Sequence, residues 1–205
     1  MVNAAMLGTT ISSTSNNGSD MRGKVEGQIS SQAKGFQVTV SGRVESGQFT
    51  DTGDISCSYE FVVGPDWQFQ NGLETAETQV SRNQAVGEHK PSVVWNFPID
   101  LRLQTTNISG WPRLALTVRD KERNLVGYGS LYVPTRGGQV TRYCRLFLPL
   151  ASSQLGDAIA ALTAELPEFY DARFTTACTG REAARVVSSG VVKIILTTRV
   201  STSQA

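Results

Sequence analysis

The stretch from Val93 to Val118 alternates apolar and polar residues, and this alternation constrains the fold more than any other feature of the sequence. In its first half the two alternating rows are Phe97, Ile99, Leu101, Leu103 and Pro98, Asp100, Arg102, Gln104. A period of two residues is typical of a half-buried β-strand. Asn, Ser and Gly between Thr105 and Gly110 indicate a turn. Leu114, Leu116 and Val118 then predict a second strand.

A tryptophan and a proline accompany the start of each of these strands. Trp95 precedes Pro98, and Trp111 directly precedes Pro112. Because proline has no N–H to donate, it fits a strand start, an edge or a bulge better than the centre of a sheet. Large aromatic side chains more often pack in a core than stack on a ligand, so we expect both tryptophans to be core residues.

The strand pattern recurs along most of the chain. Apolar residues alternate from Phe36 to Val44 and from Ile55 to Val63. Further β-rich segments run over residues 126–133, 140–150 and 191–200. Several short strands with turn residues between them predict an all-β, antiparallel β-sandwich. Strand periodicity alone does not separate an immunoglobulin-like topology from a C2-like one.

One segment, residues 152–166, has the period of a helix instead. Its apolar residues are Leu155, Ile159, Leu162 and Leu166, which fall in one stripe of a short amphipathic helix. Ser152 is the expected N-cap, and Pro167 prevents the helix from continuing.

Composition divides the chain into segments. Ser, Thr, Asn, Gly and Gln fill 17 of the 27 positions from 8 to 34, so residues 1–34 are predicted to be a disordered leader. Residues 35–200 are expected to form one domain, followed by a short tail over 201–205. Residues 68–92 are predicted to be a long polar connection anchored by Leu73 and Val80, a length that indicates a functional or partly mobile loop.

Residue types that carry catalysis are sparse. The one histidine, His89, lies in a polar run and is expected to be a solvated loop residue rather than a base. Gly127-Tyr128-Gly129 lacks the third glycine and the following helix of a dinucleotide fingerprint, so it predicts a bend or bulge in a strand. We expect neither an enzymatic activity nor a cofactor.

Metal-binding patterns are also missing. Cys57, Cys144 and Cys178 form no C-x-x-C pair, and the first two fall on the apolar rows of strands, so they are expected to be reduced, buried thiols. The aspartates are scattered, with Asp51 and Asp54 the only near pair. Calcium needs six to eight oxygen ligands, so neither a calcium switch nor a zinc site is expected.

Charge is unevenly divided between the two halves of the chain. The formal net charge of +1 argues against a strongly basic nucleic-acid binder. Residues 1–112 carry 7 basic and 11 acidic side chains, whereas residues 113–205 carry 12 and 7. A solvated surface of uneven sign explains this difference. The alternative is a basic face directed at anionic lipid or an acidic partner, formed by Arg136, Arg142 and Arg145 with contributions from Arg181 and Arg185.

Membrane and secretion signals are not evident. The densest apolar run, Val191 to Leu196, is far shorter than the 18 or more residues of a membrane span. The stretch before Arg22 has neither a basic start nor a long apolar block, so no signal peptide is predicted. We therefore expect the protein on the cytosolic side of membranes.

The central stretch resembles a known family. VVWNFPIDLRL followed by GWPRLALTV is similar to the signature of the B9 domain family, a C2-like β-sandwich family of the ciliary transition zone. The resemblance continues in the same order through GRVESGQF, FVVGPDW, GYGSLYVP, LPEFYDARF and GREAARVVSSG. Its signature positions here are Trp67, Trp95, Asn96, Phe97, Pro98, Asp100, Gly110, Trp111, Pro112, Gly127, Tyr128 and Gly129.

The resemblance implies a C2-like topology and a structural role. It implies a non-enzymatic protein that assembles with other B9-domain proteins and with tectonic-type and Meckel-syndrome proteins. It places that complex at the ciliary base, on the cytoskeleton of the basal body and transition zone, where it supports ciliogenesis and the diffusion barrier for ciliary membrane proteins. The alternative function is a calcium-independent module that binds anionic lipid by itself.

Overall fold

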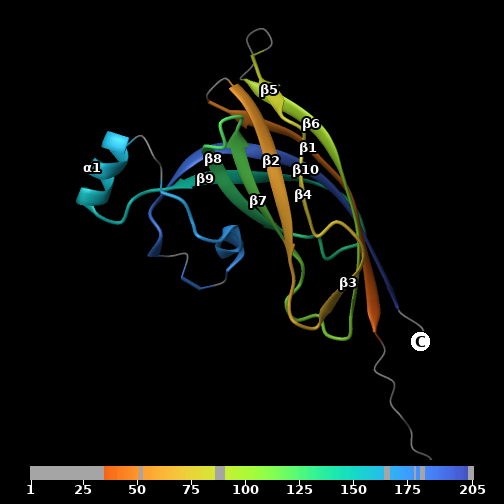
Figure 1. Ribbon diagram of the computed structural model, residues 1–205. Helices are drawn as coiled ribbons and strands as arrows, with labels where there is room; N and C mark the ends of the chain where they lie inside the picture. Colours follow the sequence, from red (N-terminus) through yellow and green to blue (C-terminus); the bar gives the residue numbers. More distant parts are fainter. Residues whose placement is uncertain are drawn as a thin grey trace, which may run out of the picture. The chain divides into compact units, whose positions relative to one another are not determined.

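Alternating apolar residues build a sheet of antiparallel strands (Figure 1). The computed structural model describes residues 35–50, 53–85, 91–163, 167–177, 179–180 and 183–202. The strands in these ranges are β1 (Phe36–Phe49), β2 (Gly53–Val62), β3 (Trp67–Gly72), β4 (Thr75–Glu77), β5 (Ser81–Asn83), β6 (Ser92–Thr105), β7 (Arg113–Asp120), β8 (Leu125–Tyr132), β9 (Gly138–Pro149) and β10 (Val186–Thr202).

The strands follow one path, β3-β6-β1-β10-β9-β8-β7-β2-β4, and β5 pairs with β2. The link between β9 and β8 is a single residue pair, Tyr128 with Phe147. At that point the sheet divides into two halves that curl toward each other. The rings of Tyr59 on β2 and Phe97 on β6 lie 6.2 Å apart across the interior, which shows that strands far apart on the path face each other.

The core fills the space between these halves. It includes Val38, Val40, Phe61, Leu101, Leu103, Leu114, Leu116, Val118, Ile194 and Leu196, all with at most 1% of their surface exposed. Burying each such side chain stabilises the fold by about 1.5–3 kcal/mol. The prediction of an all-β, antiparallel, C2-like domain with one short helix is confirmed.

The segment predicted as a long polar connection is largely paired, because it contains β3, β4 and β5. Leu73 and Val80 were expected to anchor it, and this is wrong: their side chains are 60% and 54% exposed. Two polar residues are buried in their place. Thr78 accepts a hydrogen bond from the backbone N–H of Cys57 at 3.0 Å, and Asn83 donates its amide to the carbonyl of Phe49 at 3.5 Å.

The helix α1 runs over Gln154–Thr163, inside the predicted range. The expected cap, Ser152, is wrong, since the Ser153 hydroxyl accepts the hydrogen bond from the N–H of Gly156 at 3.1 Å. A 3-10 helix, η1, follows at Ala172–Thr176. The last strand is longer than predicted at both ends and takes in Ser201 and Thr202 of the expected tail.

Several predictions fall outside the described residues. They concern the leader over residues 1–34, the connection over 86–90 with His89, and also Asp51, Leu166, Cys178, Arg181 and residues 203–205. All described residues belong to one unit, Ala33–Ala205, and the other unit is Met1–Gln32.

Candidate functional site

The WNFPID segment forms an irregularity in the pairing of β6 with β1. Val44 pairs with Phe97 and Ser46 with Val94, so Trp95 and Asn96 together oppose the single residue between Val44 and Ser46. Asn96 takes a left-handed conformation with φ of 48°, which asparagine tolerates better than most residues. Such a bulge bends the strand and redirects its side chains. Asn96 therefore contributes to the fold through its backbone conformation, which forms the bulge.

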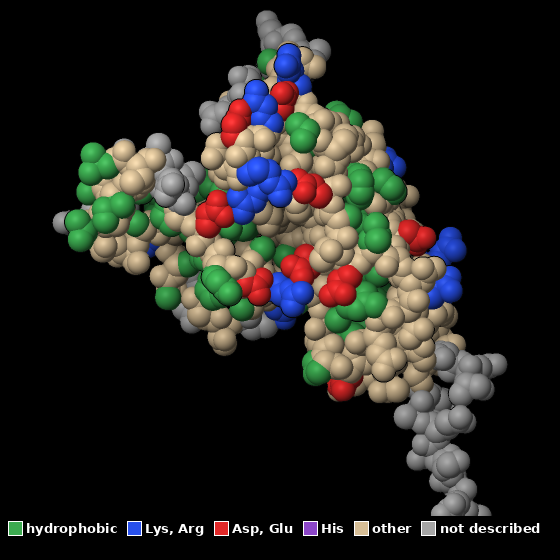
Figure 2. All heavy atoms as spheres, in the orientation of Figure 1, with side chains coloured by type: hydrophobic (Ala, Val, Ile, Leu, Met, Phe, Trp, Pro, Cys, Tyr) green, Lys and Arg blue, Asp and Glu red, His purple; other side chains and the backbone are tan. Residues whose placement is uncertain are grey.

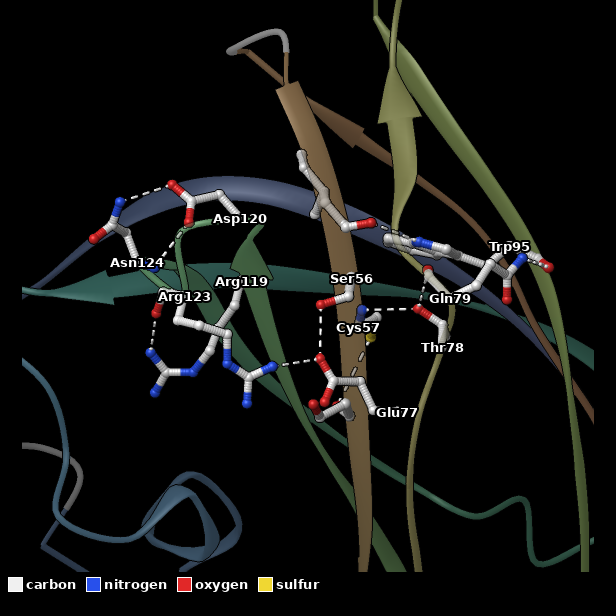
Figure 3. A network of polar contacts seen from close by, with 12 residues as sticks. Ser56, Cys57, Glu77, Thr78, Gln79, Trp95, Arg119, Asp120, Arg123 and Asn124 are labelled. Atoms are coloured by element: carbon white, nitrogen blue, oxygen red, sulfur yellow. Dashed lines mark hydrogen bonds and ion pairs between the residues drawn. The ribbon is translucent and has the colours of Figure 1, made fainter.

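Trp95 is buried at the centre of this irregularity. Its indole N–H donates to the carbonyl of Ile55 at 3.1 Å, and its own carbonyl accepts the side-chain amide of Gln79 at 2.8 Å (Figure 3). Its ring packs edge-on against Phe49 at 6.3 Å. The predicted core role of Trp95 is confirmed.

Trp67 and Trp111 form a second aromatic contact, with ring centroids 5.3 Å apart and planes at 90°. Both indole N–H groups donate to backbone carbonyls at 2.8 Å, Trp67 to Ser109 and Trp111 to Val133. Trp67 is buried, whereas Trp111 is half-buried and packs against the core. Each indole N–H therefore has a hydrogen-bond acceptor while its ring packs against apolar neighbours.

The glycines of the signature permit close approach of backbones. Gly110 has φ of 69°, and a Cβ there would lie 2.4 Å from Cα of Gly64. A Cβ on Gly127 would lie 2.3 Å from the Ser189 hydroxyl, and one on Gly129 would lie 2.6 Å from Leu146. The pairing of β7 with β8 shifts at Val126, whereas Gly127, Tyr128 and Gly129 pair in register with β7, so the irregularity predicted for this segment lies directly before it.

The remaining signature residues are distributed along the same strands. Pro98 pairs with Arg43 beside the β1–β6 irregularity, where β3 has not yet joined the other side of β6. That position at a bulge and an edge is the one predicted for it. Asp100 is exposed, and Pro112 is buried. Tyr128 is buried, with its ring 5.3 Å from that of Phe169.

Ion pairs link segments that lie far apart in the sequence. The carboxylate of Glu77 accepts from the Ser56 hydroxyl and from Arg123, both at 2.8 Å (Figure 3). Arg119 contacts Glu168 through two nitrogens at 2.6 and 3.0 Å. This hydrogen-bonded pairing raises the pKa of Arg119 and lowers that of Glu168.

A third pair joins β2 to η1. Arg173 contacts Glu60 at 2.5–2.6 Å, and the hydrogen bond raises the pKa of Arg173. The Ser130 hydroxyl on β8 also donates to the carbonyl of Thr175 at 2.7 Å. These contacts hold residues 167–177 against β2, β7 and β8, and Figure 2 shows charges of both signs interspersed on this face. The sequence analysis did not predict these ion pairs, because no local pattern identifies partners that are 49 and 113 residues apart.

Four of the described aspartates serve separate local roles. Asp66 accepts from the Asn107 amide, and Asp54 pairs with Arg82. Asp120 accepts from Asn124, and Asp171 caps η1. Within the described ranges no group of three or more His, Cys, Asp or Glu residues could hold a metal ion.

Both described cysteines are buried free thiols. Burial raises the pKa of Cys144 to about 12, and burial also raises the pKa of Cys57. The prediction that these two thiols behave as small core residues is confirmed.

Several hollows border the sheet, and two of them lie beside groups described above. The larger, of about 930 Å³, is lined by Asp54, Arg82, Asp120 and Lys121 among others, and its Asp54 and Arg82 already pair with each other. The smaller, of about 260 Å³, is apolar and is lined by Phe147, Phe169, Phe174, Thr175, Ala184 and Val186. The smaller is the size of one or two large side chains.

Six of the exposed hydrophobic residues lie on α1 or in the segments next to it. We define the α1 patch as Leu155, Ile159 and Leu162 on the helix, with Leu150, Val186 and Val187 beside its start. The stripe predicted for the helix therefore exists, but its leucines are 71% and 86% exposed. Figure 2 shows the hydrophobic side chains on the surface of α1. Backbone contact between Leu150 and Arg185 at 2.8 Å joins the two parts of the patch.

The arginines of the predicted basic face are spread over several elements. Arg136 lies in the connection before β9, and Arg185 donates to the carbonyl of Ala151 at 3.0 Å. Arg142 and Arg145 are both exposed on β9. Their separation of three residues places them on opposite faces of that strand.

Together these features define a C2-like, all-β domain. The profile of the B9-C2 family, described as ciliary basal body-associated B9 protein, matches residues 38–198. The chain belongs to this family.

Named relatives cover most of the chain. It is 34% identical over 163 residues to B9 domain-containing protein 1 of Xenopus laevis, covering 78% of this chain and 81% of the relative. It is 36% identical over 165 residues to the Homo sapiens protein of the same name, covering 78% and 79%. It is 31% identical over 120 residues to B9 domain-containing protein 2 of Rattus norvegicus, covering 57% and 66%.

In the described part of the chain, no helix is both long enough and apolar enough to cross a bilayer.

Proposed function

We propose that this chain is a non-enzymatic structural component of the ciliary transition zone. It assembles with paralogous B9-domain proteins and, through them, with tectonic-type and Meckel-syndrome proteins. In this complex it supports ciliogenesis and the barrier that limits exchange of ciliary membrane proteins.

The observation that carries the proposal is the α1 patch. Ile159 is 52% exposed, and Val186 and Val187 are 48% and 47% exposed. Exposed apolar side chains grouped along one helix and beside its start indicate a site for another molecule. The neighbouring hollow lined by Phe169 and Phe174 can accept one apolar anchor from that molecule, as interface centres commonly do.

Charge around the patch favours a protein over a membrane. Residues 146–172 contain four acidic side chains and neither Lys nor Arg. Helices that lie on anionic membranes carry Lys and Arg on their polar side. The helix segment lacks these basic residues, which favours a protein partner over an anionic bilayer.

Co-purification tests this proposal. The tagged full chain should retain its B9-domain paralogue from ciliated cells of the same organism, and Leu162→Asp should reduce the amount retained. Ala160→Asp is the matched control, since it adds the same charge to another side of the same helix. The proposal fails if the wild-type chain retains no paralogue, or if both variants behave alike with unchanged melting temperatures.

A second candidate function, binding of anionic lipid without calcium, is favoured by the outer face of β6, β1 and β10. Arg102 and Arg199 both pair with Thr39 there, so the two arginines flank one row. Arg43 and Lys193 lie nearby, but Glu45 pairs with both at 3.0 and 2.5 Å. Vesicle flotation of the purified chain, with and without phosphatidylserine and at rising salt, tests this candidate.

A further inference from the structure

Tyr170 is fully exposed on the connection that leads into η1. Its relative exposure is 108%, as high as in an extended chain, and its side chain makes no hydrogen bond or ring contact with another described residue. Large aromatic side chains normally bury much of their surface. A tyrosine that buries none of its ring therefore does not contribute to packing.

The neighbours of Tyr170 hold it in this exposed position. The ring of Phe169 packs 5.0 Å from that of Phe174 and 5.3 Å from that of Tyr128. On the other side, the carboxylate of Asp171 accepts the N–H of Arg173 at 2.8 Å and caps η1. Phe169 thus takes the inward position of this connection, and Tyr170 is presented to solvent between two anchored residues.

The other tyrosines lie within strands. The sequence contains five, of which two are buried, Tyr59 and Tyr128. Tyr132 is 58% exposed, but it pairs with Arg113 of β7, whose guanidinium lies 4.7 Å from the centre of its ring. Tyr143 is 67% exposed and pairs with Lys193 of β10. Among the five, all of them in the described part of the chain, Tyr170 alone lies outside a strand.

This difference decides which tyrosine a protein kinase can reach. The kinase must hold the hydroxyl in line with the γ-phosphorus of ATP, so the residues around the hydroxyl have to enter its cleft. A strand paired with its neighbours cannot enter, whereas residues 167–171 belong to no strand or helix. Glu168 and Asp171 flank Tyr170, and charge patterns of this kind contribute to substrate selection by kinases.

We propose that Tyr170 is a site of tyrosine phosphorylation, and that the phosphate weakens the binding of the assembly partner. The γ-phosphoryl group of Mg-ATP passes to Oη of Tyr170. The bond from the γ-phosphorus to the β–γ bridging oxygen breaks, the bond from phosphorus to Oη forms, and ADP leaves. The catalytic aspartate of the kinase takes the phenolic proton.

The expected effect on binding follows from the position of Tyr170. It directly follows Phe169, which lines the apolar hollow of about 260 Å³. A phosphate adds a charge of about −1.5 to −2 at pH 7, here between two acidic residues, and a partner that covers the hollow has to desolvate it. This part of the inference rests on the proposed function, in which the hollow accepts an apolar anchor of the partner.

Phosphorylation of the purified full chain by a tyrosine kinase of broad specificity tests the site. Mass spectrometry measures the rate at each tyrosine, relative to the rate for a short synthetic peptide around the same tyrosine. That ratio should be near one for Tyr170 and at least about tenfold lower for Tyr132 and Tyr143, because their strands must first open. Equal ratios, or a lower ratio for Tyr170, would overturn the inference.

The chain isolated from ciliated cells of the same organism provides the second test. After treatment of the cells with a tyrosine-phosphatase inhibitor, the chain should carry phosphate at Tyr170. A chain that carries none there would overturn the assignment of a modification site.

Partner retention tests the effect of the phosphate. The kinase-treated chain should retain about tenfold less B9 paralogue than the untreated chain. Tyr170→Phe is the matched variant, because it keeps the ring and removes the acceptor oxygen. Its retention should not change on kinase treatment. Equal retention by treated and untreated wild-type chain would overturn the regulatory part.

The proposed function and this inference fail separately. If the untreated wild-type chain retains no paralogue, the assembly function fails, and phosphorylation of Tyr170 is still decided by mass spectrometry. If the paralogue is retained but Tyr170 is not phosphorylated, the inference alone fails.

Discussion

The indole N–H of Trp95 donates a hydrogen bond to the carbonyl of Ile55 at 3.1 Å, across the interior of the domain. Trp95 lies on β6 and Ile55 on β2, strands that are near opposite ends of the sheet path. The bond therefore fastens the two curled halves to each other, near the place where β5 pairs with β2 and Gln84 bridges to Ser92 of β6.

Replacing Trp95 with alanine should destabilise the domain by about 3–5 kcal/mol, because it leaves a large cavity and frees the Ile55 carbonyl. Trp95→Phe keeps much of the packing and removes the donor, so its smaller cost isolates the hydrogen bond, at about 1 kcal/mol. Urea unfolding measures both. A Trp95→Ala protein with unchanged stability but lost partner binding would show that the ring serves recognition instead.

Gly110→Ala should also be destabilising, by about 1–3 kcal/mol, because alanine is strained at positive φ and its Cβ would meet the backbone of Gly64. Gly53→Ala is the control, since a Cβ there meets no atom within 4 Å. Thermal melting of the two variants compares the sites. Equal melting temperatures would contradict the argument from close approach.

Stability should fall in acid partly through Glu168. Its pairing with Arg119 holds the pKa of Glu168 below the ordinary value of 4.5 in the folded state. The unfolded chain therefore takes up this proton first as the pH falls. The Arg119–Glu168 pair contributes fully to the stability of the fold above about pH 4.5. This contribution disappears as the pH falls through the folded-state pKa of Glu168.

The variant Glu168→Gln tests this direction of the pH dependence of stability. Because both side chains are partly exposed, the variant should be less stable at pH 7 by at most about 1 kcal/mol. The difference from the wild type should shrink as the pH falls below 4. A difference that grew in acid would show that the ion pair is not its source.

The thiols of Cys57 and Cys144 should resist alkylation in the folded protein. Both are buried, and burial raises the pKa of Cys144 to about 12, so almost no reactive thiolate exists at pH 8. Mass spectrometry after iodoacetamide treatment should find both unmodified in buffer and modified in urea. Rapid labelling in buffer would mean that the strands around them open readily.

The strands that could be predicted are those with one buried face. Ile99, Leu101 and Leu103 alternate with polar residues because one row of β6 meets the core, and the pattern records this directly. The strands β3, β4 and β5 escaped prediction because they lie at edges and bury few side chains. A sequence such as Thr75–Glu77 carries no periodic signal.

Long-range pairing and surface orientation could not be predicted for a different reason. The period of Leu155, Ile159 and Leu162 shows that a stripe exists, but not what covers it. The pairing of Arg173 with Glu60 depends on how the whole chain folds back, which no local pattern records. Charge alone grouped Arg142 and Arg145 into one basic face, whereas the register of β9 with β10 places them on opposite faces of the strand.

The strand β10 lies in the middle of the sheet, between β1 and β9, although it is the last strand in the sequence. Phe36 pairs with Thr202, so during synthesis the first strand of the domain cannot form this pairing until the last strand has been made. At ribosomal speed this interval is roughly ten to thirty seconds, during which β1 lacks its neighbour β10. A premature stop codon that removes only β10 would therefore take out the centre of the sheet and leave β1 without its neighbour.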